Sequence, residues 1–363
     1  MVFNKWFVRL NWITLVLIYL VVIAGSFVRI TGSGMGCPDW PKCFGQWVPP
    51  TEASSLPENY KDIYVDKRSK KVEKFCKLLE GVGMSETAEK IRNDETVLHE
   101  EDFNARKTWT EYINRLFGFL AGNGILFVFL WIVLRYRNLS RKVTPDVIDS
   151  RFTDVSKAKS LSRKLIITAS LNLVILVFQA WFGSIVVATN LVPWTITVHM
   201  LLALVIIGLQ LYVLRLVSPS QRPHIVVSKG YFWLVIVILA ITFYQMFLGT
   251  QVREEIDVLK KSGIERGDWS QHFDLAFYVH RSFSWLVLVL IVGMFWVKRN
   301  DKKLRIIHWT FVFLVIELVS GLLLAHFNMP GLVQTAHLLF ACVIFGLLTM
   351  AALRMNVISA PKL

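Results

Sequence analysis

The chain has 363 residues, of which 54% are hydrophobic and only 18% are charged, and its mean hydropathy is +0.50. Soluble domains carry about 25% charged residues, and few of them contain 13 Trp and 25 Phe, as this chain does. The composition excludes a disordered chain, a collagen-like repeat and a small disulfide-stabilised domain. Whether the net charge of +14 reflects nucleic-acid binding depends on where the charges lie.

Eight apolar stretches follow one another along the chain, and each is long enough to cross a lipid bilayer. Most are flanked by Trp, Tyr, Lys or Arg, as membrane-spanning helices commonly are. The sequence therefore predicts an all-α integral membrane protein with eight transmembrane helices. The predicted spans are 10–28, 112–134, 165–187, 195–214, 231–250, 276–297, 306–326 and 333–353.

The charged residues divide unequally between two sets of linkers. The N-terminus, the linkers near 135–164, 215–230 and 298–305, and the C-terminus hold 21 Lys and Arg against four Asp and Glu, whereas the rest of the chain holds 19 against 22. An excess of Lys and Arg marks the cytoplasmic side of a membrane protein, so we expect both termini to be cytoplasmic. The basic charge is thereby accounted for, and the chain is expected to contact membrane lipid and no nucleic acid.

Short motifs recur between the two halves of the chain. Because each half contains four predicted spans, the two copies have the same orientation in the membrane. We therefore predict two tandem four-helix bundles, residues 1–217 and 218–363, related by a pseudo-twofold axis along the membrane normal. The recurring residues are Gly25, Val28 and Arg29 with Gly249, Val252 and Arg253, then Tyr112 and Arg115 with Tyr278 and Arg281, and finally Gly183, Asn190 and His199 with Gly321, Asn328 and His337.

The linker between the first two spans, residues 31–107, interrupts this symmetry on the extracytoplasmic side. Much of it is polar and strongly charged, but four apolar residues at helical spacing predict a short amphipathic helix. We expect a helical extracytoplasmic insertion at about 51–107, and the sequence leaves open whether it is a functional cap or a mobile segment without function. The four apolar residues are Val72, Phe75, Cys76 and Leu79.

Three histidines lie at one predicted depth in the outer half of the membrane, near the starts of spans four, six and eight: His199, His280 and His337. Ionisable groups at such a depth are costly and usually face a site inside a bundle. His280 and His337 belong to the same predicted bundle, and facing histidines of matched depth suit the two axial positions of a haem iron. A zinc ion would need further Cys, His or carboxylate ligands, which we do not find in the second half. A single histidine in a membrane helix is often a packing residue, which is the alternative for each of the three.

The first half differs from the second at two corresponding positions. Asn114 stands where the second half has His280, so His199 has no second histidine as its partner. Glu111 stands where the second half has Phe277, one helical turn before Asn114 and on the same face. The second half is therefore expected to hold a six-coordinate electron-transfer haem, and the first half a haem with an open position beside a proton donor or acceptor. The alternative for Glu111 is an interfacial residue paired with an arginine.

Four arginines occupy duplicated positions at the outer edge of the membrane: Arg29, Arg115, Arg253 and Arg281. Arginine makes planar bidentate contacts to carboxylates, and a haem carries two propionates. Two arginines for each of two haems would match in number, so these residues are candidate propionate contacts. Extension of their side chains to the lipid headgroups is the alternative.

Two cysteines lie close together in the outer linker, within the segment Cys37-Pro-Asp-Trp-Pro-Lys-Cys43. The outer side of a bacterial membrane is oxidising, so a disulfide is expected. The short loop and its two prolines favour a strained or exposed bridge, which would be redox-active, while a structural staple is the alternative. Cys76 and Cys342 have no evident partner.

The first outer loop resembles the signature of the haem A synthase family. The resemblance rests on the stretch GSFVRITGSG at 25–34, which leads into CPDWPKC at 37–43, and on the positions of the three histidines. It covers all eight spans and nearly the whole chain, while the insertion at about 51–107 is not part of the common core.

This resemblance implies an enzyme of the bacterial plasma (inner) membrane that oxidises the C8 methyl group of haem O to the formyl group of haem A, for use in terminal oxidases. By the same resemblance, His280 and His337 would bind the iron of a haem b cofactor, His199 would hold the substrate iron, and Glu111 would be the family's carboxylate. Family members commonly have a second histidine where this chain has Asn114, and some have a second cysteine pair in the loop that here spans 251–275 without any Cys.

The resemblance also implies partners for such an enzyme, namely haem O synthase and an electron donor, which would be quinol or another molecule. It places the haem sites toward the extracytoplasmic side and leaves a homo-oligomer open. The competing function is a di-haem cytochrome of the b type that only transfers electrons. Such a carrier would share the histidines but would need neither Glu111 nor an open iron position.

Overall fold

The computed structural model describes residues 3–136, 155–218, 225–300 and 305–358, and in these ranges the chain is almost entirely helical. Eight of its helices are long and apolar enough to cross a membrane, which confirms the prediction of eight spans. Parts of the basic linkers predicted to be cytoplasmic, residues 137–154, 219–224 and 301–304, lie outside the described residues. The eight helices are α1 (Lys5–Thr31), α4 (Ala105–Tyr136), α5 (Val155–Ala188), α6 (Pro193–Val217), α7 (Lys229–Lys261), α8 (Leu275–Lys298), α9 (Arg305–His326) and α10 (Gly331–Arg354).

Local sequence signals set several ends of these helices. The side chain of Asn4 accepts a hydrogen bond from the backbone N–H of Trp6 at the start of α1. Gly32 ends the same helix with a left-handed backbone (φ 63°), a conformation that favours glycine. Pro193 occupies the first turn of α6, where its missing N–H costs no helical hydrogen bond. The long apolar runs between such ends bury the backbone polar groups in intrahelical hydrogen bonds, as a bilayer requires.

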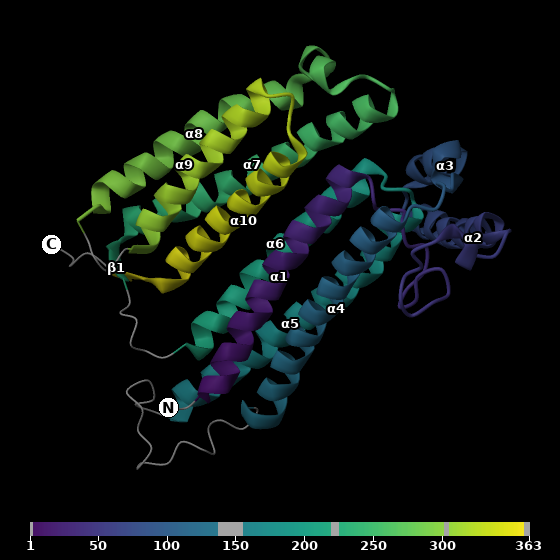
Figure 1. Cartoon of the computed structure of the whole chain (residues 1–363). Helices are drawn as coiled ribbons and strands as arrows, with labels where there is room; N and C mark the ends of the chain where they lie inside the picture. Colours follow the sequence, from purple (N-terminus) through teal and green to yellow (C-terminus); the bar gives the residue numbers. More distant parts are fainter. Residues whose placement is uncertain (1–2, 137–154, 219–224, 301–304, 359–363) are drawn as a thin grey trace.

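The long helices form two groups that lie side by side (Figure 1). Helices α1, α4, α5 and α6 pack together, with a core that includes Phe7, Ile132 and Leu165. Helices α7 to α10 form the second group, with a core that includes Ile291 and Met294. The groups meet where α10 packs against α1 and α6. The division into two tandem bundles, 1–217 and 218–363, and their origin by duplication stay predictions.

The same unusual turn joins the last two helices of each group. Asn190 and Leu191, between α5 and α6, have positive φ angles of 51° and 60°, and Asn328 and Met329, between α9 and α10, have 52° and 49°. Positive φ is uncommon outside glycine, although asparagine tolerates it best. Each turn sets how the following helix, which carries His199 or His337, faces the preceding one.

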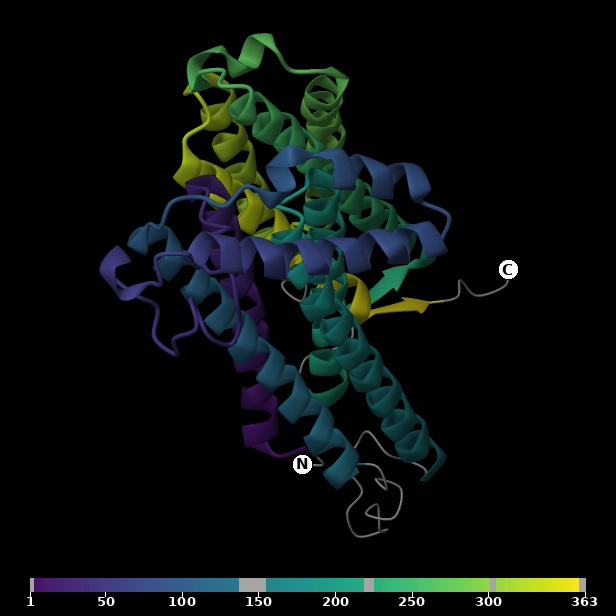
Figure 2. The ribbon, with the colours of Figure 1, turned by 90° about the vertical axis from the view of Figure 1, so that its right-hand side faces the viewer.

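The outer linker folds into two further helices, α2 (Tyr60–Gly81) and α3 (Ser85–Asn93), with short 3₁₀ turns at Ala53–Ser55 and Glu95–Leu98. The apolar residues expected on one face of α2, from Val72 to Leu79, are buried, which confirms the amphipathic helix. Helix α2 lies across the ends of the long helices of the first group (Figure 2). Its apolar face packs against Ile185 and Ala188 at the end of α5.

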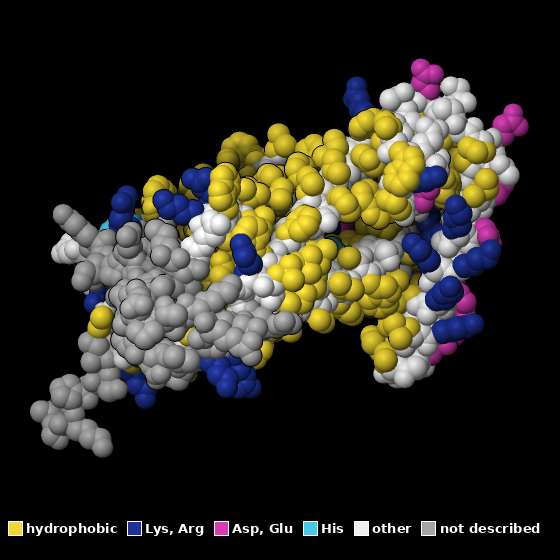
Figure 3. Space-filling view, turned by 90° about the horizontal axis from the view of Figure 1, so that it is seen from below, with side chains coloured by type: hydrophobic (Ala, Val, Ile, Leu, Met, Phe, Trp, Pro, Cys, Tyr) yellow, Lys and Arg dark blue, Asp and Glu magenta, His cyan; other side chains and the backbone are white. Residues whose placement is uncertain are grey.

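The opposite end of the molecule carries the start of α1 and the end of α10 (Figure 1). Two short strands, β1 (Ile225–Ser228) and β2 (Met355–Ile358), pair there in parallel, with Ile225 opposite Met355. On the face drawn in Figure 3, hydrophobic side chains cover the middle of the molecule and Asp and Glu gather at the end that carries α2 and α3. An apolar band between two charged ends is the surface expected of a membrane-spanning bundle.

Candidate haem sites

His280 and His337 face each other inside the second group of helices, near the start of α8 and of α10 respectively. Their ring centroids lie 6.5 Å apart, with an angle of 78° between the ring planes. Metal–imidazole bonds are about 2 Å long, so an ion bound between two rings holds their centres roughly 6 Å apart. The two histidines thus have the separation that a shared axial metal needs.

Both histidines of this pair are oriented by neighbouring residues. The Nδ1 atom of His337 lies 2.8 Å from the Ser320 hydroxyl and 3.2 Å from a carboxylate oxygen of Glu317, which leaves Nε2 for a metal. The backbone oxygen of His280 accepts a hydrogen bond of 2.8 Å from the Gln245 side chain. Ser320 and Glu317 therefore fix the ring of His337, whereas Gln245 holds the backbone turn that carries His280.

Two glycines make room for these imidazoles. A Cβ atom on Gly249 would lie 3.2 Å from His280 Cε1, and one on Gly321 would lie 3.4 Å from His337 Cε1. At such distances a larger side chain would push the ring away, so glycine permits the close approach of ring and helix. The recurring glycines Gly249 and Gly321 thus leave the space that the rings of His280 and His337 occupy.

The first group of helices repeats this construction with one histidine. A Cβ atom on Gly183 would lie 2.9 Å from His199 Cε1, and one on Gly25 would lie 3.7 Å from Asn114 Oδ1. Asn114 therefore lies beside Gly25 as His280 lies beside Gly249 in the second group. The backbone oxygen of His199 accepts a hydrogen bond of 2.9 Å from the Gln179 side chain.

In the first helix group, two buried polar atoms have no hydrogen-bond partner among the described residues: His199 Nδ1 and Asn114 Oδ1. Buried polar atoms in folded proteins are nearly always hydrogen bonded. In the second group His280 Nδ1 and Gln245 Oε1 also lack a partner, so unpartnered polar atoms occur at both sites, as fits sites that receive a polar or metal-containing ligand.

Glu111 is buried and tied to the outer loop. One of its carboxylate oxygens accepts a hydrogen bond of 2.7 Å from the backbone N–H of Cys37, and the other is paired with Arg115. Arg115 also donates to the backbone oxygen of Asp39 at 2.8 Å. The alternative expected for Glu111, an ion pair with an arginine, is therefore present, and this pair anchors the loop beside Asn114.

Cys37 and Cys43 form a disulfide, as expected, and both residues are fully buried. The expectation of an exposed bridge is therefore wrong, because Phe44 and Tyr64 pack over the loop and cover it. Its role as a staple or as a redox pair stays open. Cys76 and Cys342 are buried and free.

The four candidate propionate arginines have different surroundings. Arg29 of α1 donates to Asp257 of α7 at 2.6 and 2.9 Å, and Arg253 contacts the same carboxylate at 3.0 Å. Arg253 is also hydrogen bonded to Gln334 of α10. Arg115 is held by Glu111, as described, and Arg281 is exposed. The structure brings Arg29 and Arg253 together between the two helix groups and leaves Arg281 apart.

Asp257 is a residue that the sequence analysis missed. It lies seven residues beyond the predicted end of its span, because α7 continues to Lys261. Its spacing of four from Arg253, which places both on one helix face, is the signal that could have found it. Gln245 and Ser320 were also missed, since a single polar residue in an apolar span carries no pattern.

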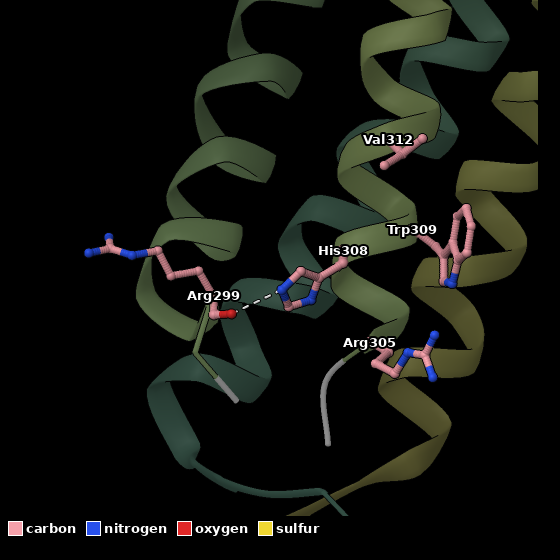
Figure 4. Close-up of a pocket in the computed structure, with 5 residues that line it drawn as sticks. All are labelled: Arg299, Arg305, His308, Trp309 and Val312. Atoms are coloured by element: carbon pink, nitrogen blue, oxygen red, sulfur yellow. Dashed lines mark hydrogen bonds between the residues drawn. The ribbon is translucent and has the colours of Figure 1, made fainter. Parts of the chain in front are cut away.

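Other regions do not add ligands to these sites. A pocket of about 570 Å³ lies at the far end of α8 and α9, lined by Arg299, Arg305, His308, Trp309 and Val312 (Figure 4). In this pocket His308 Nε2 lies 2.9 Å from the backbone oxygen of Arg299, at the end of α8 opposite to His280. His326 is exposed at the end of α9. Among the residues that the structure describes, no group of three His, Cys, Asp or Glu could hold a bare metal ion.

Comparison with known proteins agrees with this arrangement. The chain is 21% identical over 355 residues to Heme A synthase of Wolbachia sp. subsp. Brugia malayi, a match that covers 91% of each protein. It is also 21% identical to Heme A synthase of Wolbachia pipientis wMel, with 94% of this chain and 92% of that protein covered. A shorter match, 43% identical over 51 residues, covers 13% of this chain and 16% of Heme A synthase of Shewanella oneidensis.

The model of a protein family also matches most of the chain. This family, COX15-CtaA, is described as cytochrome oxidase assembly protein, and its model matches residues 8–80 and 84–349. The match runs through α2 and α3, so it gives no support to the expectation that the insertion lies outside the common core. On the extent of this match, the chain belongs to the COX15-CtaA family of cytochrome oxidase assembly proteins.

Proposed function

We propose that this protein is an oxidoreductase that converts haem O into haem A by oxidising the C8 methyl group to a formyl group. The observation that carries the proposal is the unequal pair of sites: two facing histidines in one helix group, and in the other one histidine together with an asparagine at the position that corresponds to His280. A protein that only transferred electrons would be served by two closed sites. One closed and one open site suits an enzyme in which cofactor and substrate are both haems.

The cofactor is assigned to the second group of helices. His280 and His337 would bind the iron of haem b on its two faces, and their ring separation of 6.5 Å fits that role. When bound, haem b supplies one-electron transfer. The protein's own contribution is to fix the ring of His337 through Ser320 and Glu317 and to keep the site closed to further ligands.

The substrate is assigned to the first group of helices. His199 would hold the haem O iron from one side, while Asn114, a poor ligand for iron, leaves the other side open. The buried carboxylate of Glu111, one turn from Asn114, is placed to accept or return protons near the reacting edge of the substrate. Conversion of a methyl to a formyl group removes two hydrogen atoms and adds one oxygen atom. This is a four-electron oxidation. If the oxygen atom comes from water, an external acceptor must take four electrons; if it comes from O2 through two successive hydroxylations, each step consumes one O2 and two electrons from a donor and releases one water.

The proposal includes a position in the cell. With the basic linkers in the cytoplasm, both termini lie on the cytoplasmic side of a bacterial plasma membrane. The haem sites then lie toward the outer face of this membrane, under α2. Haem O synthase is the proposed source of the substrate. The redox partner, quinol or another molecule, and a homo-oligomeric state belong to the same proposal.

Reconstitution of the purified protein with haem O tests this function. We expect mass analysis of the extracted pigment to show haem A, and we expect the protein as isolated to contain haem B together with haem O or A. A preparation that contains only haem B, and that leaves haem O unchanged in the presence of O2 and a quinone couple, would instead support the di-haem electron carrier.

A further inference from the structure

Helix α2 crosses the ends of the long helices of the first group, from one side of the group to the other. Near its start, Tyr64 packs edge-on against Phe44, with ring centroids 5.4 Å apart, and Phe44 belongs to the loop that Glu111 and Arg115 fix to α4. Toward its end, Phe75 stacks on Trp194 at the start of α6, with centroids 6.3 Å apart. The middle of α2 therefore lies above the ends of α4 and α6, the helices that carry Asn114 and His199.

Lys71 lies in this middle part and on the inward side of the helix. It follows Arg68 by three residues and precedes Phe75 by four, and both of these side chains are buried, so the helical repeat places Lys71 on the same face. Lys71 nevertheless remains exposed. A lysine on the inward face that is not covered by protein is available to a ligand beneath the helix.

Two cations that neighbour Lys71 in α2, Arg68 and Lys70, are already paired, while Lys71 is not. Buried Arg68 pairs with Glu100, and Lys70 contacts Asp66 at 2.6 Å and points to solvent. In the described part of the chain Lys71 has no ion-pair partner. Partial burial and the positive charge of Arg115 lower the pKa of the Lys71 ammonium group. Lys71 is therefore close enough to Arg115 for the two charges to repel each other.

Carboxylates of a substrate in this site need a cation that is still free. Arg115 is compensated by Glu111, and Arg29 and Arg253 share Asp257. From the position of α2 and the free charge on its inward face, we propose that Lys71 binds a propionate of the substrate haem, with Arg115 as the neighbouring donor. This inference rests on the proposed function, since it assumes that the first helix group receives the substrate.

Binding of haem O to the purified full-length protein tests the role of Lys71. We expect Lys71→Ala to raise the Kd of haem O about tenfold, the loss of one charge-assisted contact. The Kd of haem O dimethyl ester, in which both propionates lack charge, should stay unchanged. Lys70→Ala is the matched control, because it removes a lysine from the outward face of the same helix, and it should bind both ligands like the wild type.

The pH dependence gives a readout that loss of packing would not change. A bound carboxylate favours the charged form of Lys71, so binding takes up a proton once the pH exceeds the lowered pKa of the free protein. The affinity for haem O should therefore fall as the pH rises in the wild type, and this fall should be absent in Lys71→Arg, because arginine stays protonated. The other charges near Lys71, Arg115 with Glu111 on α4 and Arg68 with Glu100, are present in both proteins.

Three outcomes would overturn the inference. In the first, Lys71→Ala binds haem O as tightly as the wild type. In the second, Lys71→Ala loses affinity for haem O and for haem O dimethyl ester to the same extent, which would indicate a disturbed α2. In the third, it binds haem O normally but loses affinity for vesicles of anionic phospholipid, which would assign Lys71 to lipid headgroups. Because all three are binding measurements, they are separate from the proposed function, which fails only if the wild type does not convert bound haem O.

Discussion

Each helix group places two glycines against side chains of its candidate site, and the groups differ in which side chains these are. In the second group, Gly249 and Gly321 receive two histidines, and in the first, Gly25 and Gly183 receive Asn114 and His199. The groups differ again at their outer ends, since only the first is crossed by α2 and by the disulfide loop (Figure 2). A common arrangement of glycines thus accompanies two histidines in one group and one histidine with an asparagine in the other, and single residues, rather than a change of fold, account for this difference.

The largest effect is expected from breaking the closed site. His280→Ala or His337→Ala should remove stable low-spin haem b, because each deletes one of two axial ligands, and turnover should be lost with the cofactor. The optical spectrum and the haem content of the purified variants measure this. His326→Ala is the control, since His326 is exposed at the end of α9. Full haem content and an unchanged low-spin spectrum in both variants would refute the assignment.

The next effect concerns Glu111, a carboxylate at a position where the second group has Phe277. Glu111→Gln should lower turnover about 100-fold or more, the usual contribution of a general acid or base, while haem b content stays at the wild-type level. Asn114→Ala should keep measurable activity, because Asn114 is not a strong iron ligand. Glutamine can still accept the hydrogen bond from Cys37, so the loop should remain in place. Retained turnover in Glu111→Gln would leave this residue only its structural role beside Arg115.

A third variant converts the open site toward the closed one. In Asn114→His the new imidazole would face Gly25, as His280 faces Gly249, and it should give the substrate haem a second histidine ligand. We expect its spectrum to change from high-spin to low-spin and its turnover to fall several-fold, because the open position is lost. A substrate haem that is already low-spin in the wild type, with two histidine ligands, would show that another histidine occupies the site.

Much of this architecture could be predicted from the sequence, because its strongest signals are long and periodic. Runs of about 20 apolar residues identified all eight long helices, and the spacing from Val72 to Leu79 identified α2. The sequence also showed that Gly25 recurs as Gly249 and Gly183 as Gly321, but only the structure shows that Gly183, Gly249 and Gly321 lie against histidine rings. These predictions depend on residue type and order within one helix.

Contacts between distant segments could not be predicted in the same way. Asp257 joins Arg29 and Arg253 across the two groups, yet it lies beyond the apolar part of α7, where the sequence resembles a linker. Strands β1 and β2 pair segments 130 residues apart, Ile225 with Met355, and each has only four residues. The inward position of Lys71 depends on how α2 is anchored at both ends, which its own helical pattern does not contain.

The smallest effect is expected at the disulfide loop of the first group. Among the described residues, the second group has no corresponding disulfide. Replacing both Cys37 and Cys43 by Ser should lower the free energy of unfolding by about 2 kcal/mol, the entropy of closing so short a loop, and so lower the thermal unfolding temperature in detergent. Because both cysteines are fully buried and the Cys37 N–H still holds Glu111, turnover per molecule with haem b bound should stay within about twofold of the wild type. Cys76→Ser, which removes a buried free thiol from the outer linker, controls for the change of atom. If turnover instead falls at unchanged haem b content and unchanged unfolding temperature, the bridge takes part in redox chemistry, and the open site then differs from the closed one by a redox group as well as by its ligands.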